Sequence, residues 1–191
     1  MKKFIIFSVL LLVAGCKKEN PKVLFTCSAG SFTVELYPEQ APVTVANFLK
    51  YVRENRYKDA TFYRAVTLEN QPANNIKIEV IQGGLWADQH PDRLPPIAHE
   101  TTEKTGIHHL DGVISMARLQ PGTASDAFFI CIGSQPSLDY GGMRNPDGQG
   151  FAAFGQVIEG MNVVRFIQKY PANGQYLEPQ LPVSIRLISI E

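Results

Sequence analysis

Residues 76–84 are Ile-Lys-Ile-Glu-Val-Ile-Gln-Gly-Gly, a run in which apolar and polar side chains alternate before a pair of glycines. Alternation with a period of two is typical of a β-strand, so we expect a strand over 76–82 that ends at Gly83-Gly84. A polar loop, residues 68–75, precedes this run. Before the loop, residues 61–66 are a second strand-like run, Thr-Phe-Tyr-Arg-Ala-Val. The centre of the chain is therefore predicted to be β-structure.

Outward from this centre, the chain continues as short strands with few helices. A hairpin is expected over 23–37, and an amphipathic helix that opens on a proline is expected over 42–54. Residues 85–109 and 133–150 show little periodicity and are predicted to be long surface loops. The other predicted elements are strands over 112–117, 127–132, 151–158 and 183–190 and a helix over 161–170.

These elements amount to about eight short strands and two helices, with neither β-α-β alternation nor an internal repeat. Eight strands can close into a barrel that is filled by side chains. The predicted fold class is therefore all-β dominated, and the chain length favours a single domain, which we place at residues 23–191.

Composition limits the function classes. The 191 residues include 18 Lys+Arg and 18 Asp+Glu, so the chain is not a globally basic nucleic-acid binder, and no nucleic-acid partner is predicted. Hydrophobic residues make up 45%, too many for a disordered chain. Fifteen glycines and thirteen prolines make the sequence rich in turns, which again favours β-structure.

Residues 1–15 are predicted to be a signal peptide. A positively charged head precedes residues 4–13, which are apolar apart from one serine and too few to span a membrane as a helix. A buried N-terminal strand or helix is the alternative. Residues 13–16, Val-Ala-Gly-Cys, resemble the lipobox of bacterial lipoproteins. That resemblance implies cleavage before Cys16, lipidation of Cys16 and a polar tether over 16–22.

The lipobox also predicts where the protein resides. Several acyl chains on Cys16 would anchor it stably to a membrane. We therefore expect a lipid-anchored protein of the bacterial cell envelope that faces the periplasm. Lys17, rather than an aspartate, follows the modified cysteine, which favours the outer membrane. No later segment is long and apolar enough to span a membrane.

The remaining cysteines and the histidines give no clear site. Cys27 and Cys131 lie in apolar runs, where they could form a disulfide in an exported protein or remain small buried side chains. Residues 99–103, His-Glu-Thr-Thr-Glu, lack the second histidine of a metalloprotease motif. No metal and no cofactor is predicted. A metal site formed by the four histidines stays an open alternative: His90, His99, His108 and His109.

Several segments occur in an ordered set along the chain. They are Phe-Tyr-Arg at 62–64, Val-Ile-Gln-Gly-Gly at 80–84, Ile-Ser-Met-Ala at 114–117, Ala-Phe-Phe-Ile at 127–130, Phe-Gly at 154–155 and Gly-Met at 160–161. In order and spacing they resemble the cyclophilin-type peptidyl-prolyl isomerases, over about residues 23–191. The resemblance implies a closed eight-stranded barrel capped by two α-helices. It also implies a monomeric isomerase that assists the folding of exported proteins and acts on proline-containing unfolded or extended polypeptides.

The resemblance assigns catalysis to Arg64 and Gln82. Rotation about an X-Pro bond must overcome about 18–20 kcal/mol of amide resonance, and the prolyl nitrogen becomes basic as that resonance is lost. The rigid guanidinium of Arg64 can hold the substrate carbonyl and reach this nitrogen, while Gln82 orients the substrate backbone. The substrate-binding residues implied are Val80, Ala117, Phe129, Leu138 and Phe151, the last in place of a pocket histidine.

Structural readings of these residues stay open beside the functional ones. Arg64 could be a barrel-surface arginine paired with a carboxylate, and Gln82 could cap the glycine turn. Phe129 and Leu138 could belong to the core.

The chain departs from the family pattern around the predicted groove. The departures are Ser137 for a tryptophan, Glu79 for a pocket phenylalanine, Arg118 for an asparagine, Ala127 for a polar residue, and an extra loop over 140–150 before Phe151. They leave a catalytically weak peptide-binding or chaperone lipoprotein open as an alternative function. A structural lipoprotein is a third possibility.

Overall fold

The computed structural model describes residues 19–87 and 89–189. The predicted signal peptide over 1–15 and the lipidation at Cys16 lie outside the described residues. Among the described helices, none is long and apolar enough to cross a membrane. The elements are β1 (Lys22–Cys27), β2 (Gly30–Leu36), α1 (Pro42–Arg53), β3 (Thr61–Val66), β4 (Val80–Gly84), α2 (Thr102–Thr105), β5 (Val113–Met116), β6 (Phe128–Cys131), the 3-10 helix η1 (Pro136–Leu138), β7 (Ala152–Glu159), α3 (Met161–Gln168), β8 (Ala172–Asn173), β9 (Tyr176–Pro182) and β10 (Ser184–Ser189).

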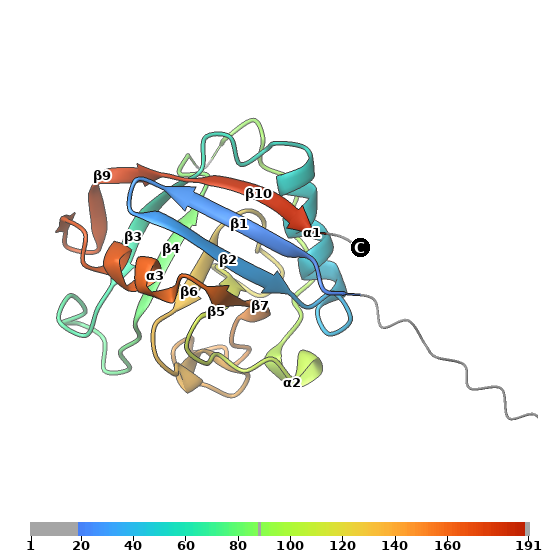
Figure 1. The fold of residues 1–191 in the computed structure, drawn as a ribbon. Helices are drawn as coiled ribbons and strands as arrows, with labels where there is room; N and C mark the ends of the chain where they lie inside the picture. The colour runs from blue at the N-terminus through green and yellow to red at the C-terminus, as the bar shows by residue number, and fades with distance from the viewer. Residues whose placement is uncertain (1–18, 88, 190–191) are drawn as a thin grey trace, which may run out of the picture.

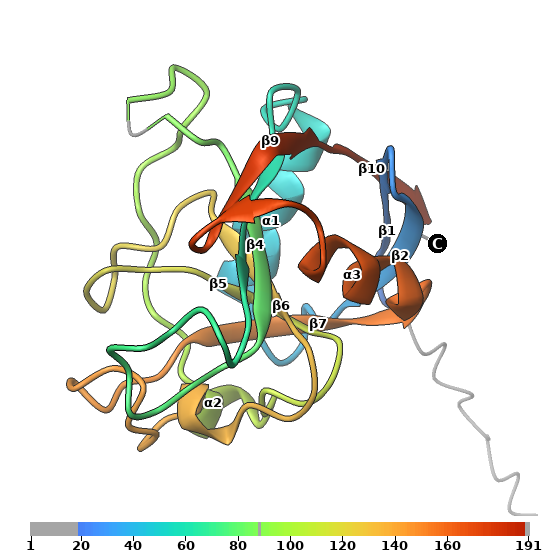
Figure 2. The ribbon, with the colours of Figure 1, turned by 90° about the vertical axis from the view of Figure 1, so that its left-hand side faces the viewer.

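All the described strands belong to one sheet in the order β10-β1-β2-β7-β5-β6-β4-β3-β9-β8. The sheet rolls up, with α1 at one opening and α3 at the other (Figure 1). Figure 2 looks along the roll, with α3 in front of α1. The prediction of a mostly-β fold is thus confirmed, and the helix expected over 42–54 is confirmed as α1.

The predicted closed eight-stranded barrel with two helices is wrong in three details. The sheet has ten strands, its end strands β10 and β8 are not paired with each other, and a third short α-helix, α2, lies inside the expected loop over 85–109. The reason lies in the last part of the chain. Only Val183 separates β9 from β10. The chain therefore runs directly from β9, which pairs with β3, to β10, which pairs with β1, and no hydrogen bonds between the described strands close the roll at this point.

The two strands that the sequence analysis missed are β8 and β9. Residues 171–182 contain three prolines, and proline within a run normally argues against a strand. In the structure β9 pairs with β3, which aligns Leu181 with Phe62 and Tyr176 with Arg64. This pairing brings a segment more than a hundred residues away to the predicted catalytic arginine.

Aromatic side chains fill the inside of the roll. Phe25 stacks on Phe32 with ring centroids 4.8 Å apart. Phe128 packs edge-on against Phe25, Phe48 and Phe62, at centroid distances of 5.6, 5.9 and 6.0 Å. All five rings are buried. Burial of such a side chain contributes about 1.5–3 kcal/mol, so this cluster is a main source of stability.

The strand predicted over 76–82 begins later, at Val80. The buried side chain of Gln71 explains the late start. It donates a hydrogen bond to the carbonyl of Ile78 (2.7 Å) and accepts one from the amide of Ile78 (3.3 Å). These backbone groups are therefore satisfied without a neighbouring strand. At the other end of β4, a Cβ on Gly83 would lie 2.8 Å from the carbonyl oxygen of Thr61, so only glycine fits.

Candidate active site

A β-bulge in β3 places Arg64 on the outer face of the sheet. Phe62 pairs with Gly83 and Arg64 with Gln82, so β3 uses one residue more than β4 at this point. In regular alternation Arg64 would point to the same side as Phe62, which is buried in the aromatic core. The extra residue, Tyr63, reverses the alternation. Arg64 then lies in a row of paired residues that crosses the outer face through Gln82, Phe129 and Ser115.

Two glutamines hold the Arg64 guanidinium. Nη1 donates to Oε1 of Gln82 (2.9 Å), while Nε (3.0 Å) and Nη2 (2.5 Å) both donate to Oε1 of Gln175. The amide of Gln82 donates in turn to the hydroxyl of Tyr63 (2.9 Å), whose pKa burial raises to about 12. Burial lowers the pKa of Arg64, yet an arginine remains charged at neutral pH.

This geometry contradicts the structural readings of both polar residues. Among the described residues Arg64 has no carboxylate partner, and Gln82 bonds to side chains rather than capping the glycine turn. Sequence reasoning missed Gln175. It lies between β8 and β9, in a segment without periodicity, so no sequence signal pointed to it.

The five predicted substrate-binding residues come together beside this row. Val80, Phe129 and Leu138 are buried members of an apolar cluster separate from the aromatic core, and Ala117 and Phe151 pack against it half-buried. Phe151 meets Phe129 edge-on at 5.3 Å. Phe129 and Leu138 are both buried, so the reading that they are core residues stays open, although their cluster is separate from the aromatic core. Their role in substrate binding stays a prediction.

A buried polar group supports this cluster from behind. The His109 ring lies parallel to Phe129 at 5.8 Å, and it is completely buried. Its Nδ1 is 2.7 Å from Asp139, and its Nε2 is 3.0 Å from the hydroxyl of Ser115. The order resembles a serine hydrolase triad, but Ser115 has no exposed surface and cannot reach a substrate. Burial lowers the pKa of His109 in spite of Asp139, which favours the neutral ring.

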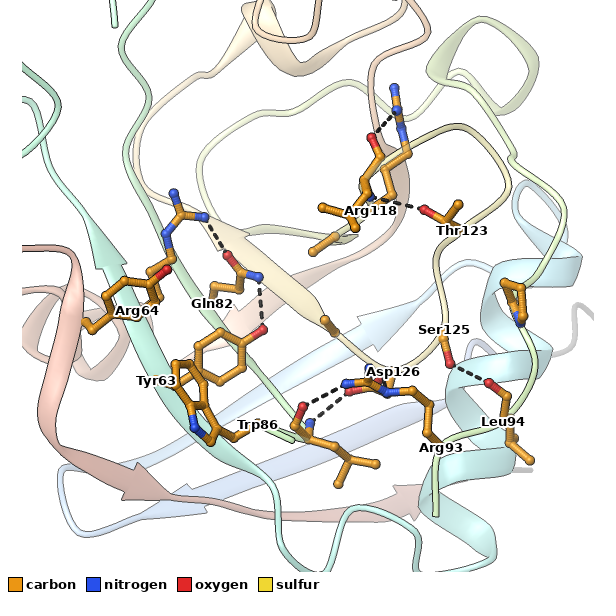
Figure 3. Close-up of a pocket in the computed structure, with 16 residues that line it drawn as sticks. Tyr63, Arg64, Gln82, Trp86, Arg93, Leu94, Arg118, Thr123, Ser125 and Asp126 are labelled. Atoms are coloured by element: carbon orange, nitrogen blue, oxygen red, sulfur yellow. Dashed lines mark hydrogen bonds and ion pairs between the residues drawn. The ribbon is translucent and has the colours of Figure 1, made fainter. Parts of the chain in front are cut away.

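A cavity of about 740 Å³ adjoins the same row of residues. It shares Arg64, Gln82 and Ala117 with the predicted site but not the buried members of the apolar cluster. Figure 3 shows Arg64 bonded to Gln82 and, nearer the viewer, Trp86 against Tyr63. A cavity of this size accommodates a peptide segment rather than a single side chain.

A profile of the family described as "Cyclophilin type peptidyl-prolyl cis-trans isomerase/CLD" matches residues 22–190. The chain belongs to the cyclophilin family. It is accordingly a peptidyl-prolyl cis-trans isomerase, an enzyme.

The curated relatives cover most of both chains. The "Peptidyl-prolyl cis-trans isomerase cyp18" of Streptomyces antibioticus is 33% identical over 82% of this chain and 88% of its own length. The "Peptidyl-prolyl cis-trans isomerase A" of Dickeya dadantii is 32% identical over 88% and 83%. A solved cyclophilin-type isomerase from Cryptosporidium parvum shares the fold, with a TM-score of 0.69 at 22% identity, and covers 88% of this chain and 99% of its own.

Arg118, one of the departures from the family pattern, fastens the extra loop. Its guanidinium makes a two-bond ion pair with Asp147 (2.7 and 2.9 Å) and donates to the carbonyl of Gly150 (2.8 and 2.6 Å). Only 1% of the Arg118 side chain is exposed, and its Cζ lies 5.2 Å from the centroid of Phe151. In this cyclophilin Arg118 is thus a clamp that fixes the loop and Phe151 together.

The structure also shows where Glu79 and Ser137, two of the other departures, lie. Glu79 accepts a hydrogen bond from Gln168 of α3 (3.3 Å), so its carboxylate does not enter the apolar cluster. Ile78, on the same side as Val80, supplies an apolar side chain there instead. The carbonyl of Ser137 accepts the amide of Arg144 from the extra loop (3.1 Å).

The Arg118 clamp predicts an acid-resistant carboxylate. The hydrogen bond from Arg118 lowers the pKa of Asp147 to about 2. Because this pKa lies below its ordinary value, the stabilising contribution is present above about pH 4 and is lost as the pH falls toward 2. An NMR titration should show a side-chain midpoint near 2 for Asp147, and a higher midpoint in an Arg118→Gln variant, where the amide of Gln149 still donates to the carboxylate. Equal midpoints in the two proteins would contradict the clamp.

The histidines do not assemble into the metal site left open above. His108 and His109 both contact Asp139, and His99 contacts the carbonyl of Gln149. In the described chain, ligand atoms of Asp59, His90 and Asp92 lie within 4.8 Å of one another, but the Lys58 ammonium sits 3.0 Å from Asp92. Cys27 and Cys131 are free thiols, so the disulfide reading is wrong.

Proposed function

We propose that this cyclophilin turns X-Pro bonds of unfolded or extended polypeptides exported to the cell envelope, with Arg64 as the main catalytic residue. The observation that carries the proposal is a partly buried, charged guanidinium held by two glutamines beside an apolar cluster, with no carboxylate to neutralise it among the described residues. A charge placed in this way can act on a substrate dipole.

The hydrogen-bond count leaves donors for the substrate. A guanidinium has five N–H groups, and in Arg64 the two glutamines occupy one each on Nε, Nη1 and Nη2. One N–H on Nη1 and one on Nη2 remain. These can bind the prolyl carbonyl and approach the prolyl nitrogen as it becomes pyramidal. Because the nitrogen is basic only in the twisted state, this bond lowers the barrier more than it favours the bound substrate.

The apolar cluster is the proposed seat of the proline ring. Phe129 packs nearly perpendicular to the half-buried Phe151, and Ala117 packs against the same cluster, which also contains the buried Val80 and Leu138. Gln82, fixed between Arg64 and Tyr63, orients the substrate backbone. A solved Cryptosporidium parvum relative was obtained in the presence of the dipeptide Ala-Pro, which supports a proline peptide as the ligand.

NMR exchange spectroscopy on short X-Pro peptides tests this proposal. Uncatalysed cis-trans isomerisation of an X-Pro bond takes tens to hundreds of seconds. The purified protein should make this exchange much faster. Peptide binding without any acceleration would instead favour the catalytically weak binding or chaperone module.

We further propose that Cys16 is lipidated and tethers a monomeric domain to the periplasmic face of the outer membrane. The first described strand begins at Lys22, so the proposed link between the anchor and the domain would be residues 16–21, one residue shorter than expected from the sequence. A short tether would keep the active site close to newly exported chains.

Cys16→Ser is expected to release the protein from the membrane or leave an uncleaved precursor. The thiol is the proposed acyl acceptor, and a serine hydroxyl does not replace it. Fractionation after a high-salt wash measures the effect, with a Cys27→Ser variant as the matched control that stays membrane-bound. If the Cys16→Ser protein still fractionated with membranes at its mature size, the lipoprotein proposal would be wrong.

A further inference from the structure

Arg144, in the extra loop, lies at the opposite end of the apolar cluster from Arg64. The chain leading into β4 shows the arrangement. Gln82 contacts Arg64, Val80 and Ile78 belong to the cluster, and the carbonyl of Ile76 accepts a hydrogen bond from Nη1 of Arg144 (2.6 Å). The two guanidinium groups therefore flank the proposed proline seat.

The backbone around Arg144 is held in place from several sides. Its amide donates to the carbonyl of Ser137, and the amide of Phe151 donates to the carbonyl of Leu138 (2.9 Å). The Arg118 clamp fastens the end of the same loop. Figure 2 shows this loop before β7 beside the loop that joins β3 to β4. Arg144 is thus a fixed part of the rim rather than a side chain on a loose loop.

The charge of Arg144 is not neutralised within the described chain. Its guanidinium donates to the carbonyl of Ile76, and acids of the neighbouring segments have other partners. Asp147 pairs with Arg118, Asp139 with His109, and Glu79 with Gln168. The pKa of Arg144 is lowered by its partial burial and by the positive charge of Arg64, which places the two cations within electrostatic reach of each other.

We propose that Arg144 is a specificity-determining residue that favours substrates with an acidic side chain directly after the proline. The inference rests on the proposed function. With the proline on the cluster and its carbonyl on Arg64, residues before the proline enter the cavity of about 740 Å³ that adjoins Gln82 and Ala117. The residue after the proline starts at the carbonyl held by Arg64, and its side chain can extend across the cluster toward Arg144. A carboxylate there meets a cation that has no acidic partner in the described chain, and the two cations together attract it from solution.

Paired peptides test this assignment, with exchange rates measured by NMR so that no coupling protease adds its own preference. One peptide carries Glu after the proline, a second carries Gln there, and a third carries Glu before the proline. Wild-type protein should give a kcat/KM about two- to fivefold higher for Pro-Glu than for Pro-Gln at low salt. The ratio should shrink as salt rises.

Variants assign the effect to one side chain. Arg144→Gln should bring the Pro-Glu to Pro-Gln ratio to about one, and Arg144→Lys should keep part of it because the charge is retained. Arg53→Gln, at the exposed end of α1, should leave the ratio and the turnover of both peptides unchanged. The ratio also controls for any general loss of activity, and thermal melting reports whether each variant folds.

Several outcomes would overturn the inference. They are equal rates for the two peptides with active wild-type protein, a ratio that Arg144→Gln does not alter, or a gain only when Glu precedes the proline. A wild-type protein inactive on every peptide would instead contradict the proposed function.

Discussion

Arg64→Ala is expected to lower kcat/KM for an X-Pro peptide by about ten- to a hundredfold. A hydrogen bond to a charged group contributes about 1.5–3 kcal/mol, which corresponds to that range in rate when the bond is made in the transition state. The side chain lies on the outer face of the sheet, away from the aromatic core, so the variant should fold. NMR exchange rates and a melting curve measure the two quantities separately.

Two further variants define what Arg64 contributes. Arg64→Lys keeps a positive charge but loses the planar fork held by Gln82 and Gln175, so we expect only partial activity. Arg186→Ala removes an exposed arginine from β10 and should have no effect. Unchanged kcat/KM in Arg64→Ala would remove Arg64 from the mechanism and favour a peptide-binding module.

Phe128→Ala and Phe129→Ala should have different consequences although the residues are adjacent and of one type. Phe128 lies at the centre of the aromatic core, so its truncation should cost about 3–5 kcal/mol and lower Tm by about 6–20 °C. Phe129 faces outward into the smaller cluster. Its truncation should lower kcat/KM about tenfold or more, with a smaller loss in Tm, because the proposed proline seat is lost.

Leucine variants serve as controls for this pair. Phe128→Leu should recover part of the lost Tm because it refills part of the volume. Phe129→Leu should recover stability more fully than turnover, because it lacks the flat ring that His109 and Phe151 hold. If both alanine variants lost the same amount of Tm and kept the same turnover, the prediction would be wrong. The inner face of β6 would then not serve mainly stability, nor the outer face mainly activity.

Local patterns in the sequence were enough for much of the fold. The proline at the start of α1, the strand-like run of β3 and the apolar run of β6 each depend on neighbours only a few residues away, and each element was found. The ordered set of motifs also led to the family and to Arg64, Gln82 and Phe129. These signals lie within short segments, where backbone preference and side-chain periodicity dominate.

The rest depends on contacts between segments far apart in the chain. β9 was missed because its prolines weaken any local strand signal, whereas its pairing with β3 is a long-range contact. The same pairing delivers Gln175 to Arg64, and no sequence pattern foretells it. His109 likewise showed only as an adjacent pair of histidines until the fold brought Asp139 and Ser115 to its ring.

The bulge at Tyr63 shows most clearly what the sequence determined and what the tertiary structure decided. The sequence determined that Phe62 and Arg64 share a strand, and simple alternation would place both on one face. Burying an unpaired guanidinium among aromatic rings costs far more than one irregular step in a ladder. The sheet therefore accepts the extra residue, Phe62 stays in the core, and Arg64 emerges beside Gln82. The face on which a side chain lies was decided by burial in the whole roll. This burial depends on residues far apart in the chain, so no short segment of the sequence can predict it.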